Sequence, residues 1–229
     1  MICRGRLFLP FLILAAALPS RAAGDFAISA APSSRTVIQG QGTSYTVTIT
    51  PSGGFKDYVT VTVSGLPDGA QANPVSVPPK TPWPVTVTTS TSTPPGTYLL
   101  TFTGASGALS HSTTATLIVD PIPPDFSLTA TPSSRDVTQG ESTSYSISVV
   151  PTGGFSGVVS FAVSGLPAGA SGTFDPATVT GSGSTAMSVA TQASTPAGEW
   201  TLTITGTSGG LQRTAVVTLR ISQVGADFS

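Results

Sequence analysis

Residues 45–50 read Tyr45-Thr46-Val47-Thr48-Ile49-Thr50, with an apolar side chain at every second position. A period of two places alternate side chains on opposite faces of a β-strand, so the apolar set faces a core and the threonines face solvent. Threonine is β-branched and suits an exposed strand surface. The same alternation recurs at residues 59–63, 85–88, 98–102 and 115–119. The pattern predicts an all-β fold with essentially no helix.

The same pattern occurs twice in the chain. Residues 25–72 and 125–172 align without a gap, from an Asp-Phe opening to a Ser-Gly-Leu-Pro turn. Beyond residue 72 the offset rises from 100 to 102, and we expect the two additional residues of the second copy to lie in a surface loop. Self-similarity at a fixed period indicates a modular array. We therefore expect two domains of the same fold.

Glycine and proline clusters separate about seven alternating runs in each copy, as expected for an immunoglobulin-like β-sandwich. We predict one sandwich over residues 25–119 and a second over residues 125–221. Residues 120–124, Asp-Pro-Ile-Pro-Pro, form a linker that favours polyproline II, so we expect an elongated pair with little interface. Residues 222–229 are expected to hold a second linker and the start of a third, truncated module that continues past Ser229.

The N-terminus has the features of a secretory signal peptide, which we assign to residues 1–24. Arg4 and Arg6 precede a short apolar run, and small residues follow it. The run is too short to cross about 30 Å of hydrocarbon. We therefore expect an extracellular or cell-surface protein with no stable membrane span after cleavage. Cys3 is the only cysteine and would be removed, so stability must come from core burial without disulfides.

Charged residues make up only 8% of the chain, against about 25% in an average protein. The net charge is −1, and loss of Arg4, Arg6 and Arg21 with the signal would leave six cations against ten carboxylates, or −4. Apolar residues are nevertheless regularly spaced, so we expect folded modules with hydroxyl-rich surfaces. No basic patch is present to attract nucleic acid.

Several short motifs occur at matching places in both copies: Asp-Phe, Gly-Gly-Phe, Ser-Gly-Leu-Pro-x-Gly, Pro-x-Gly-x-Tyr/Trp and Thr-Gly-x-Ser-Gly. Over residues 25–221 the chain resembles the tandem immunoglobulin-like or fibronectin-III-like repeats of bacterial secreted and cell-surface proteins, and also the accessory modules of bacterial glycosidases. The resemblance implies a sandwich fold and a role in adhesion, spacing or display, and it brings no catalytic residues. Residues 94–98 look like a tyrosine corner. Trp200 replaces Tyr98 in the second copy, where we expect a core position without the corner hydrogen bond.

Two glycine-containing motifs are similar to signatures of catalysis or cofactor binding. Residues 206–210, Gly-Thr-Ser-Gly-Gly, match a nucleophile elbow, and residues 181–186, Gly-Ser-Gly-Ser-Thr-Ala, match a loose dinucleotide fingerprint. Both chemistries need a helix directly after the motif. Strands are expected there instead, so we interpret the first motif as a hairpin turn and the second as a loop. We predict no catalytic residue and no cofactor.

Among the carboxylates, only the opening aspartate of each module recurs. We expect it to form an ion pair with the arginine ten residues later, Asp25 with Arg35 and Asp125 with Arg135. His111 is the only histidine, and we interpret it as an exposed strand residue. A carboxylate pair for acid–base chemistry would have to be unique to one module or straddle both. The charged groups therefore indicate structural roles.

A metal site is not expected either. One histidine and no cysteine after residue 24 exclude the familiar zinc sites. Calcium at the junction of the modules would have Asp120 and Asp125, which supply fewer oxygen ligands than the six to eight that calcium takes.

Trp83 is the one candidate ligand contact. It lies among the prolines of residues 78–84, which are expected to run along a sheet edge because proline removes backbone donors there. It aligns with Thr185, whose polarity indicates that the position can face water, and an exposed ring can stack on a sugar. The interpretation we favour is that Trp83 shares parity with Val85 and closes the end of the core.

These observations predict a secreted or cell-surface structural or adhesive array whose modules serve as a spacer or interaction scaffold, without catalysis. The alternative is an accessory, carbohydrate-binding region of a larger secreted glycosidase or other hydrolase, which a catalytic domain encoded downstream would favour. We expect monomeric modules with an extracellular protein or glycan as partner. The sequence names neither the ligand nor the mode of anchoring.

Overall fold

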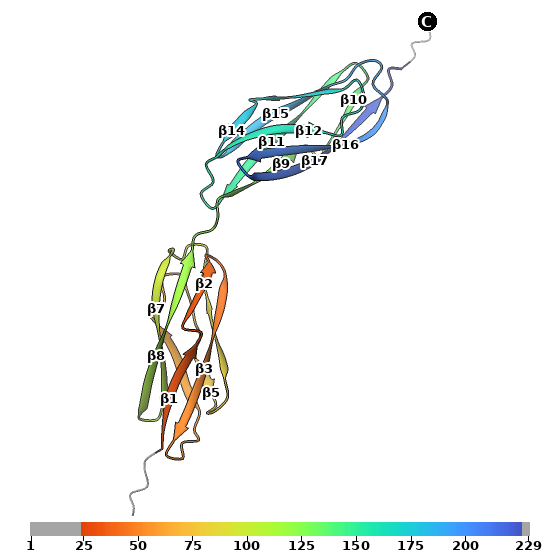
Figure 1. Cartoon of the computed structure of the whole chain (residues 1–229). Coiled ribbons are helices and arrows are strands. Elements are labelled where there is room, and N and C mark those ends of the chain that lie inside the picture. The colour runs from red at the N-terminus through yellow and green to blue at the C-terminus, as the bar shows by residue number, and fades with distance from the viewer. Residues whose placement is uncertain (1–23, 226–229) are drawn as a thin grey trace, which may run out of the picture. The chain divides into compact units, whose positions relative to one another are not determined.

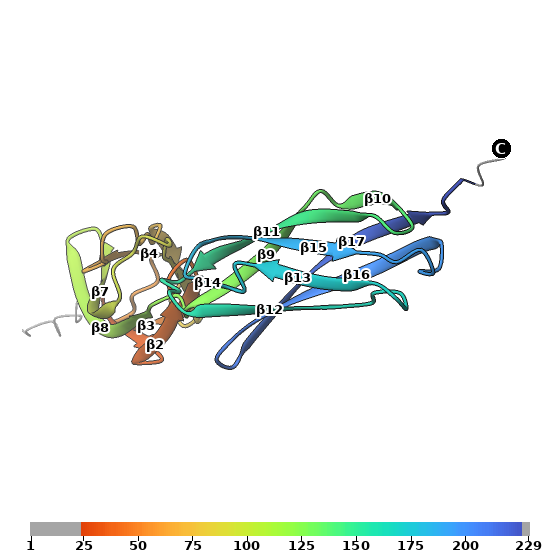
Figure 2. The same ribbon diagram turned by 90° about the horizontal axis from the view of Figure 1, so that it is seen from above.

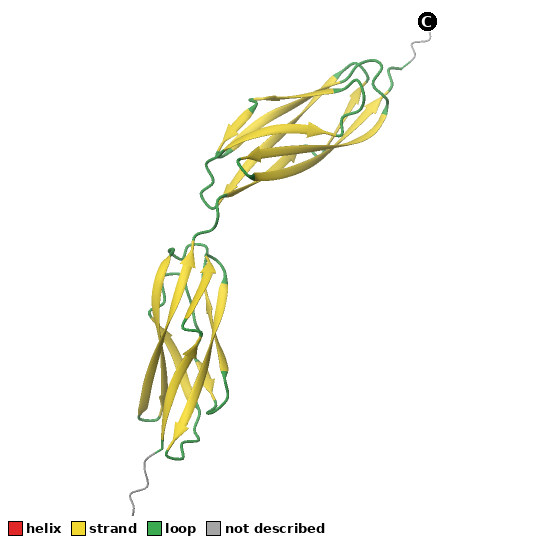
Figure 3. Cartoon of the chain, viewed as in Figure 1, coloured by secondary structure: helices red, strands yellow, loops and turns green. Residues whose placement is uncertain are grey.

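The computed structural model describes residues 24–225, which form strands and connecting turns (Figure 3). No helix occurs among these residues, which confirms the all-β prediction. Accordingly, no described segment is a helix with the length and apolar character needed to cross a membrane. The predicted signal sequence up to residue 23 and the predicted start of a third module lie outside the described residues.

The chain divides into two compact units, Met1–Asp120 and Pro121–Ser229, and each unit has its own hydrophobic core. Eight strands form the first unit (Figure 1). Their bounds are β1 Asp25–Ala31, β2 Ser34–Ile38, β3 Gly42–Ser52, β4 Val59–Ser64, β5 Val75–Val77, β6 Trp83–Thr88, β7 Gly96–Ser106 and β8 Leu109–Asp120. One sheet has the order β1-β3-β6 and the other β2-β8-β7-β4-β5.

Nine strands form the second unit. Their bounds are β9 Asp125–Thr131, β10 Ser134–Thr138, β11 Ser142–Thr152, β12 Val158–Ser164, β13 Ser171–Asp175, β14 Thr178–Thr180, β15 Gly183–Ala190, β16 Gly198–Ser208 and β17 Leu211–Ser222. The sheets have the orders β13-β15-β11-β9 and β10-β17-β16-β12-β14. All pairings are antiparallel except β2 with β8 and β10 with β17.

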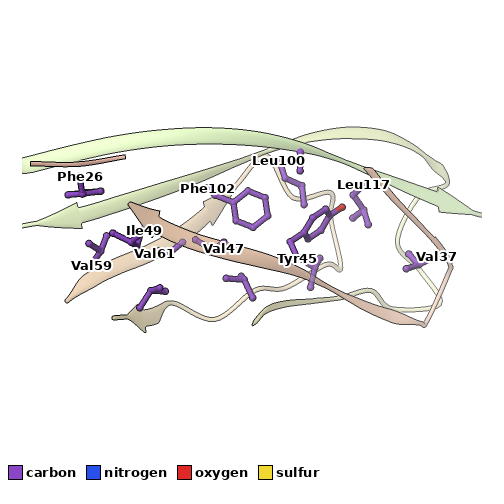
Figure 4. Close-up of a cluster of buried hydrophobic side chains, with 14 of the residues drawn as sticks. Phe26, Val37, Tyr45, Val47, Ile49, Val59, Val61, Leu100, Phe102 and Leu117 are labelled. Atoms are coloured by element: carbon purple, nitrogen blue, oxygen red, sulfur yellow. The ribbon is translucent and has the colours of Figure 1, made fainter. Parts of the chain in front are cut away.

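The core of each unit lies between its two sheets. In the first unit, alternate residues of β3 and β7 are fully buried, as the period of two predicts: Tyr45, Val47, Ile49, Leu100 and Phe102. Figure 4 shows these side chains gathered between the strands. Two sheets packed face to face over one such core, with a first strand divided between them, make each unit an immunoglobulin-like β-sandwich.

The units have eight and nine strands where the alternation predicts about seven, and one additional strand in each unit has a local cause. The first strand of each unit breaks at Pro32-Ser33 or Pro132-Ser133. The residues that follow cross to the other sheet and pair in parallel with its strand, as β2 and β10. These short segments carry one buried valine each, Val37 and Val137, which is too little to produce a visible alternation.

The two units differ most in the segment that joins β4 to β6 in the first unit. In the second unit β13 pairs with all of Ala186–Ala190 in β15 (Figure 2). In the first unit the matching contact is one backbone pair, Gln71 with Thr88. β6 is therefore an edge strand, and the prolines of residues 78–84 lead into it as predicted.

Candidate functional site

Asp25, which opens β1, is held by a residue that sequence reasoning did not pair with it. Its Oδ1 accepts hydrogen bonds from the His111 Nε2, at 2.7 Å, and from the Phe26 backbone N–H, at 2.8 Å. The bond from His111, followed by that from Phe26, lowers the pKa of the Asp25 carboxyl below its ordinary value. The imidazole also packs edge-on against the Phe26 ring, with 4.8 Å between ring centroids. His111 is thus a structural partner as well as a half-exposed strand residue.

The second unit repeats this arrangement with a different cation. Arg213 Nη2 donates to Asp125 Oδ2 at 2.5 Å, and the Phe126 N–H donates to Oδ1 at 2.7 Å. The bond from Arg213 is the main cause that lowers the pKa of the Asp125 carboxyl. Asp–cation pairs therefore recur at the same place, formed by aligned residues of different chemistry.

The expected pairs of Asp25 with Arg35 and Asp125 with Arg135 are wrong. Arg35 lies opposite Leu117, six residues along β8 from His111, which is about 20 Å in a strand. Its Nε donates to the Ser44 carbonyl at 3.3 Å. Arg135 makes the same contact with a backbone carbonyl, that of Ser144, at 3.0 Å. Sequence proximity was misleading because the chain between the aspartate and the arginine is nearly extended: Asp25 lies opposite Ser52 at one end of β3, and Arg35 bonds Ser44 near the other end.

Other recurring polar residues also bond to the backbone across the sandwich. The hydroxyls of Tyr45 and Tyr145 donate to the carbonyls of Thr116 and Thr218, each at 2.7 Å. Burial raises the pKa of both tyrosines above the ordinary value. These groups tie the two sheets together and are occupied in doing so.

The tyrosine corner is present in the first unit. Tyr98 Oη donates to the Pro94 carbonyl at 2.8 Å. Trp200, at the matching position, packs against the core of the second unit, and its Nε1 is buried without a hydrogen-bond partner. The expectations for both residues are confirmed.

The two motifs that are similar to catalytic and cofactor-binding signatures span strand ends and turns. In the elbow-like motif the first three residues end β16, and the turn is Gly209-Gly210, with Ser208 paired to Leu211 across the hairpin. In the second motif only Gly181-Ser182 is a connection, from β14 to β15, and the other four residues begin β15, so the loop interpretation holds only in part; no helix follows either motif. Residues 24–225 contain no cluster of three or more histidine, cysteine or carboxylate residues that could hold a metal ion.

Trp83 lies at the start of the edge strand β6, opposite Val47 of β3. It has the same parity as the buried Val85, but the residue is 40% exposed and belongs neither to the core cluster nor to the partly buried residues packed against it, so the interpretation that it closes the end of the core is not confirmed. The inference that the polar Thr185 occupies a water-facing position is wrong. Thr185 is 2% exposed, and its hydroxyl donates to the Pro176 carbonyl at 2.6 Å. The second unit therefore buries a small polar group where the first presents a large aromatic ring.

A surface groove of about 440 Å³ lies beside the Gly-Gly-Phe turn of the first unit. We call it the lysine groove; it is lined by Pro51, Ser52, Gly53, Gly54, Phe55, Lys56, Pro79 and Lys80. Lys56 and Lys80 are the only lysines in the entire chain. Neither makes an ion pair with another described residue. Sequence reasoning missed this groove, although the confinement of both lysines to one module was a usable signal.

Lys80 has an unusual backbone conformation. Its φ is +69°, and it is the only described residue other than glycine with a positive φ. An L-residue in this region pays roughly 1–2 kcal/mol, and such strain persists only where surrounding contacts enforce it. One such contact is the bond from the Lys80 N–H to the Ile49 carbonyl, at 2.8 Å.

Two exposed aromatic residues, Tyr58 and Trp83, follow the groove-lining segments closely in the sequence, although neither lines the lysine groove. Tyr58 is 65% exposed and directly precedes Val59 of β4. Val59 pairs with Val77 of β5, and Pro79 of the groove follows two residues later. Trp83 lies opposite Val47 of β3. Val47 is two positions from Ile49, whose carbonyl accepts the hydrogen bond from Lys80, so these two β3 residues are about 7 Å apart.

The sequence matches no model of a protein family, and no curated protein matches it. Solved structures with a similar chain path include chimeric titin Z1Z2 with a decorin peptide, at 16% identity, covering 88% of this chain and 98% of that one, with a TM-score of 0.33. The D00-D0 domain of intimin is 12% identical and covers 85% and 98%, with a TM-score of 0.33. The fibronectin(III)-like modules of Clostridium thermocellum CbhA are 13% identical and cover 86% and 94%, with a TM-score of 0.31. At these values the likenesses assign neither family nor function.

Proposed function

We propose that this chain belongs to a secreted or cell-surface array of immunoglobulin-like modules that acts by spacing and by binding at its surface, without catalysis. The observation that carries the proposal is that the recurring polar side chains form contacts within their own module. The opening aspartates bond His111 and Arg213, and the buried tyrosines bond strand carbonyls. What the two modules share in polar chemistry therefore serves the sandwich, and the lysines and the tryptophan that only the first module carries at matching positions are exposed.

Composition supports the extracellular part of the proposal. The strand faces toward solvent are rich in threonine and serine, and charged residues make up 8% of the chain. Such a surface offers few sites to proteases that cut at lysine or arginine. The signal-like residues 1–24 provide the route of export.

The proposal is tested by activity and by location. We expect the purified protein, residues 25–229, to give no turnover with panels of glycosidase, esterase and peptidase substrates. Turnover that persists through purification and is lost on a single substitution in the chain would overturn it. We also expect the native protein in the culture medium or on the cell surface, and a strictly cytoplasmic location with residues 1–24 intact would contradict the proposal.

A second candidate function is an accessory, carbohydrate-binding region of a larger secreted hydrolase. The exposed Trp83 ring at the sheet edge favours it, because an aromatic face can contribute about 1 kcal/mol beyond burial. Pull-down with insoluble polysaccharides tests this candidate. Binding that is lost in Trp83→Ala would support it, and equal retention of both proteins would count against it.

A further inference from the structure

We infer that the lysine groove of the first module is a binding site for an acidic polysaccharide, a glycan whose sugar rings carry carboxylate or sulfate groups. The inference rests on the proposed interaction function and names the ligand class and the place. It uses charge, shape and two nearby aromatic residues, and the second module repeats neither the lysines nor the aromatic residues.

Charge points to an anion. Both lysines of the chain line one groove, and neither is neutralised by a described carboxylate. Asp57 follows Lys56 in sequence but does not line the groove. Residues 25–229 carry six cations and ten carboxylates, so the protein as a whole repels polyanions. Attraction of an acidic polymer must therefore come from a local site, and surface charges act over about 10 Å at ordinary salt.

The shape of the groove is set before any ligand arrives. Its walls include Pro51 and Pro79, and Phe55, buried against Phe26, adjoins its base. The backbone of Lys80 is held in the left-handed region by its bond to Ile49. A preformed site loses little conformational entropy on binding, which favours affinity. Strain of this kind is common at ligand-binding positions.

The two exposed aromatic residues near the groove favour a sugar over an acidic peptide. Tyr58 and Trp83 are both exposed and lie near the ends of the segments that carry the lysines. The electron-rich face of an aromatic ring attracts the C–H groups on one side of a pyranose, while the lysines attract its charged substituents. Charge and an apolar ring face combine in one repeating unit of an acidic polysaccharide.

The second module supplies an internal comparison. The residues that align with Lys56, Tyr58, Lys80 and Trp83 are Ser156, Val158, Ser182 and Thr185. All the features that indicate an acidic glycan are thus absent from a module whose fold is the same. The site is therefore a property of the first module and not of the sandwich.

Binding of the two-module protein (residues 25–229) to polygalacturonate, dextran sulfate, neutral dextran and polyglutamate tests the inference. The variant is Lys56→Gln with Lys80→Gln, and the matched control, with the same change in charge, is Arg135→Gln with Arg220→Gln. We expect wild-type protein and the control to bind one or both charged glycans within twofold of each other. We expect the lysine variant to bind about tenfold more weakly, and neutral dextran not to bind.

Equal binding by wild-type protein and the lysine variant, or an equal loss in the control, would overturn the inference. Polyglutamate binding as tight as that of the glycans, and unchanged by Trp83→Ala, would assign the groove to acidic peptides and overturn it as well. Absence of binding to every charged probe would also overturn it, yet the proposed function would stand unless turnover were found. Stronger binding to polygalacturonate indicates a carboxylated glycan, and stronger binding to dextran sulfate a sulfated one; either result supports the site.

A second variant guards against loss of fold. Lys80→Gly removes one charge while glycine accepts the positive φ that lysine adopts there. We expect it to melt no lower than a few degrees below the wild type and to bind about threefold more weakly. Unchanged affinity in this variant would contradict a role for Lys80.

Discussion

The two modules align without a gap up to residues 72 and 172 and differ in the segment that follows. In the second, β13 pairs with β15 along Ala186–Ala190 and is itself the edge strand. In the first, the matching strand β6 keeps only the Gln71–Thr88 pair, and a groove of about 270 Å³ lies where β13 would run, lined by Gln71, Asn73, Val75, Pro84, Thr86 and Thr88. The features that the modules share hold the sandwich together. The features that differ leave the first module with a barer edge, an exposed tryptophan and both lysines.

The shared core should give the largest effects in either module. Phe102 aligns with Ile204, and both side chains are fully buried. We expect Phe102→Ala to cost about 3–5 kcal/mol of unfolding free energy and Ile204→Ala about 2–5 kcal/mol, because each leaves a cavity. Calorimetry of the two-module protein should show one transition lowered in each variant. Loss of less than about 1 kcal/mol at either site would contradict the common core.

Because only the second module has a paired strand at this edge, a proline there should lower its stability more than a proline at the matching place in the first module. Thr173 lies two residues beyond the Ser171–Ala190 pair, as Asn73 lies two beyond Gln71–Thr88. Thr173→Pro removes a donor from a strand ladder, and we expect a loss of about 3 kcal/mol. Asn73→Pro changes a segment without a ladder, so a loss under about 1 kcal/mol is expected. Denaturant titration measures both, and equal losses would break the comparison.

The hydrogen bonds to Asp25 and Asp125 should make both modules sensitive to acid. The pKa values of the two carboxyls lie below the ordinary 3.8, so the stability that their ionised forms contribute is present above about pH 4 and fades as pH falls through the lowered value. We expect melting temperatures to fall from about pH 4 to about pH 2, and less steeply in Asp25→Asn and Asp125→Asn, which are less stable at pH 7. Identical slopes in wild type and variants would show that other groups dominate.

The corner position should give the smallest difference. Tyr98→Phe removes the hydrogen bond to Pro94, and we expect a cost of about 0.5–1.5 kcal/mol. Trp200→Tyr restores a hydroxyl that can reach the matching carbonyl of Pro196 while removing an unpaired buried N–H. We expect these gains to offset most of the lost ring area, so that stability changes by under about 1 kcal/mol. Chemical unfolding of the two variants side by side measures the contrast.

The sequence predicted what depends on local pattern. Alternation around Tyr45 and Tyr145 identifies strands and buried faces, because a period of two needs no knowledge of distant contacts. The sheet switch that creates β2 and β10 was missed, since five residues with one buried valine carry no periodic signal. The error over Arg35 has a separate cause, because ten residues of extended chain place an aspartate and an arginine too far apart for an ion pair.

The candidate site was less predictable than the fold. Trp83 could be singled out by its neighbours, but whether the ring faces water depends on how β6 ends, which the residue pattern does not determine. The lysine groove joins residues 51–56 to residues 79–80, and their proximity follows from the pairing of β3 with the segment before β6. Contacts of this range are set by packing, not by spacing in the sequence.

The central claim is that the first module carries a ligand site that the second lacks. Backbone NMR of the two-module protein titrated with trigalacturonic acid and with a sulfated trisaccharide tests it most directly. We expect chemical shifts to move at residues 51–58 and 79–83 and to stay unchanged at residues 151–158 and 181–185. Shifts of equal size in both modules, or shifts confined to the second, would contradict the claim.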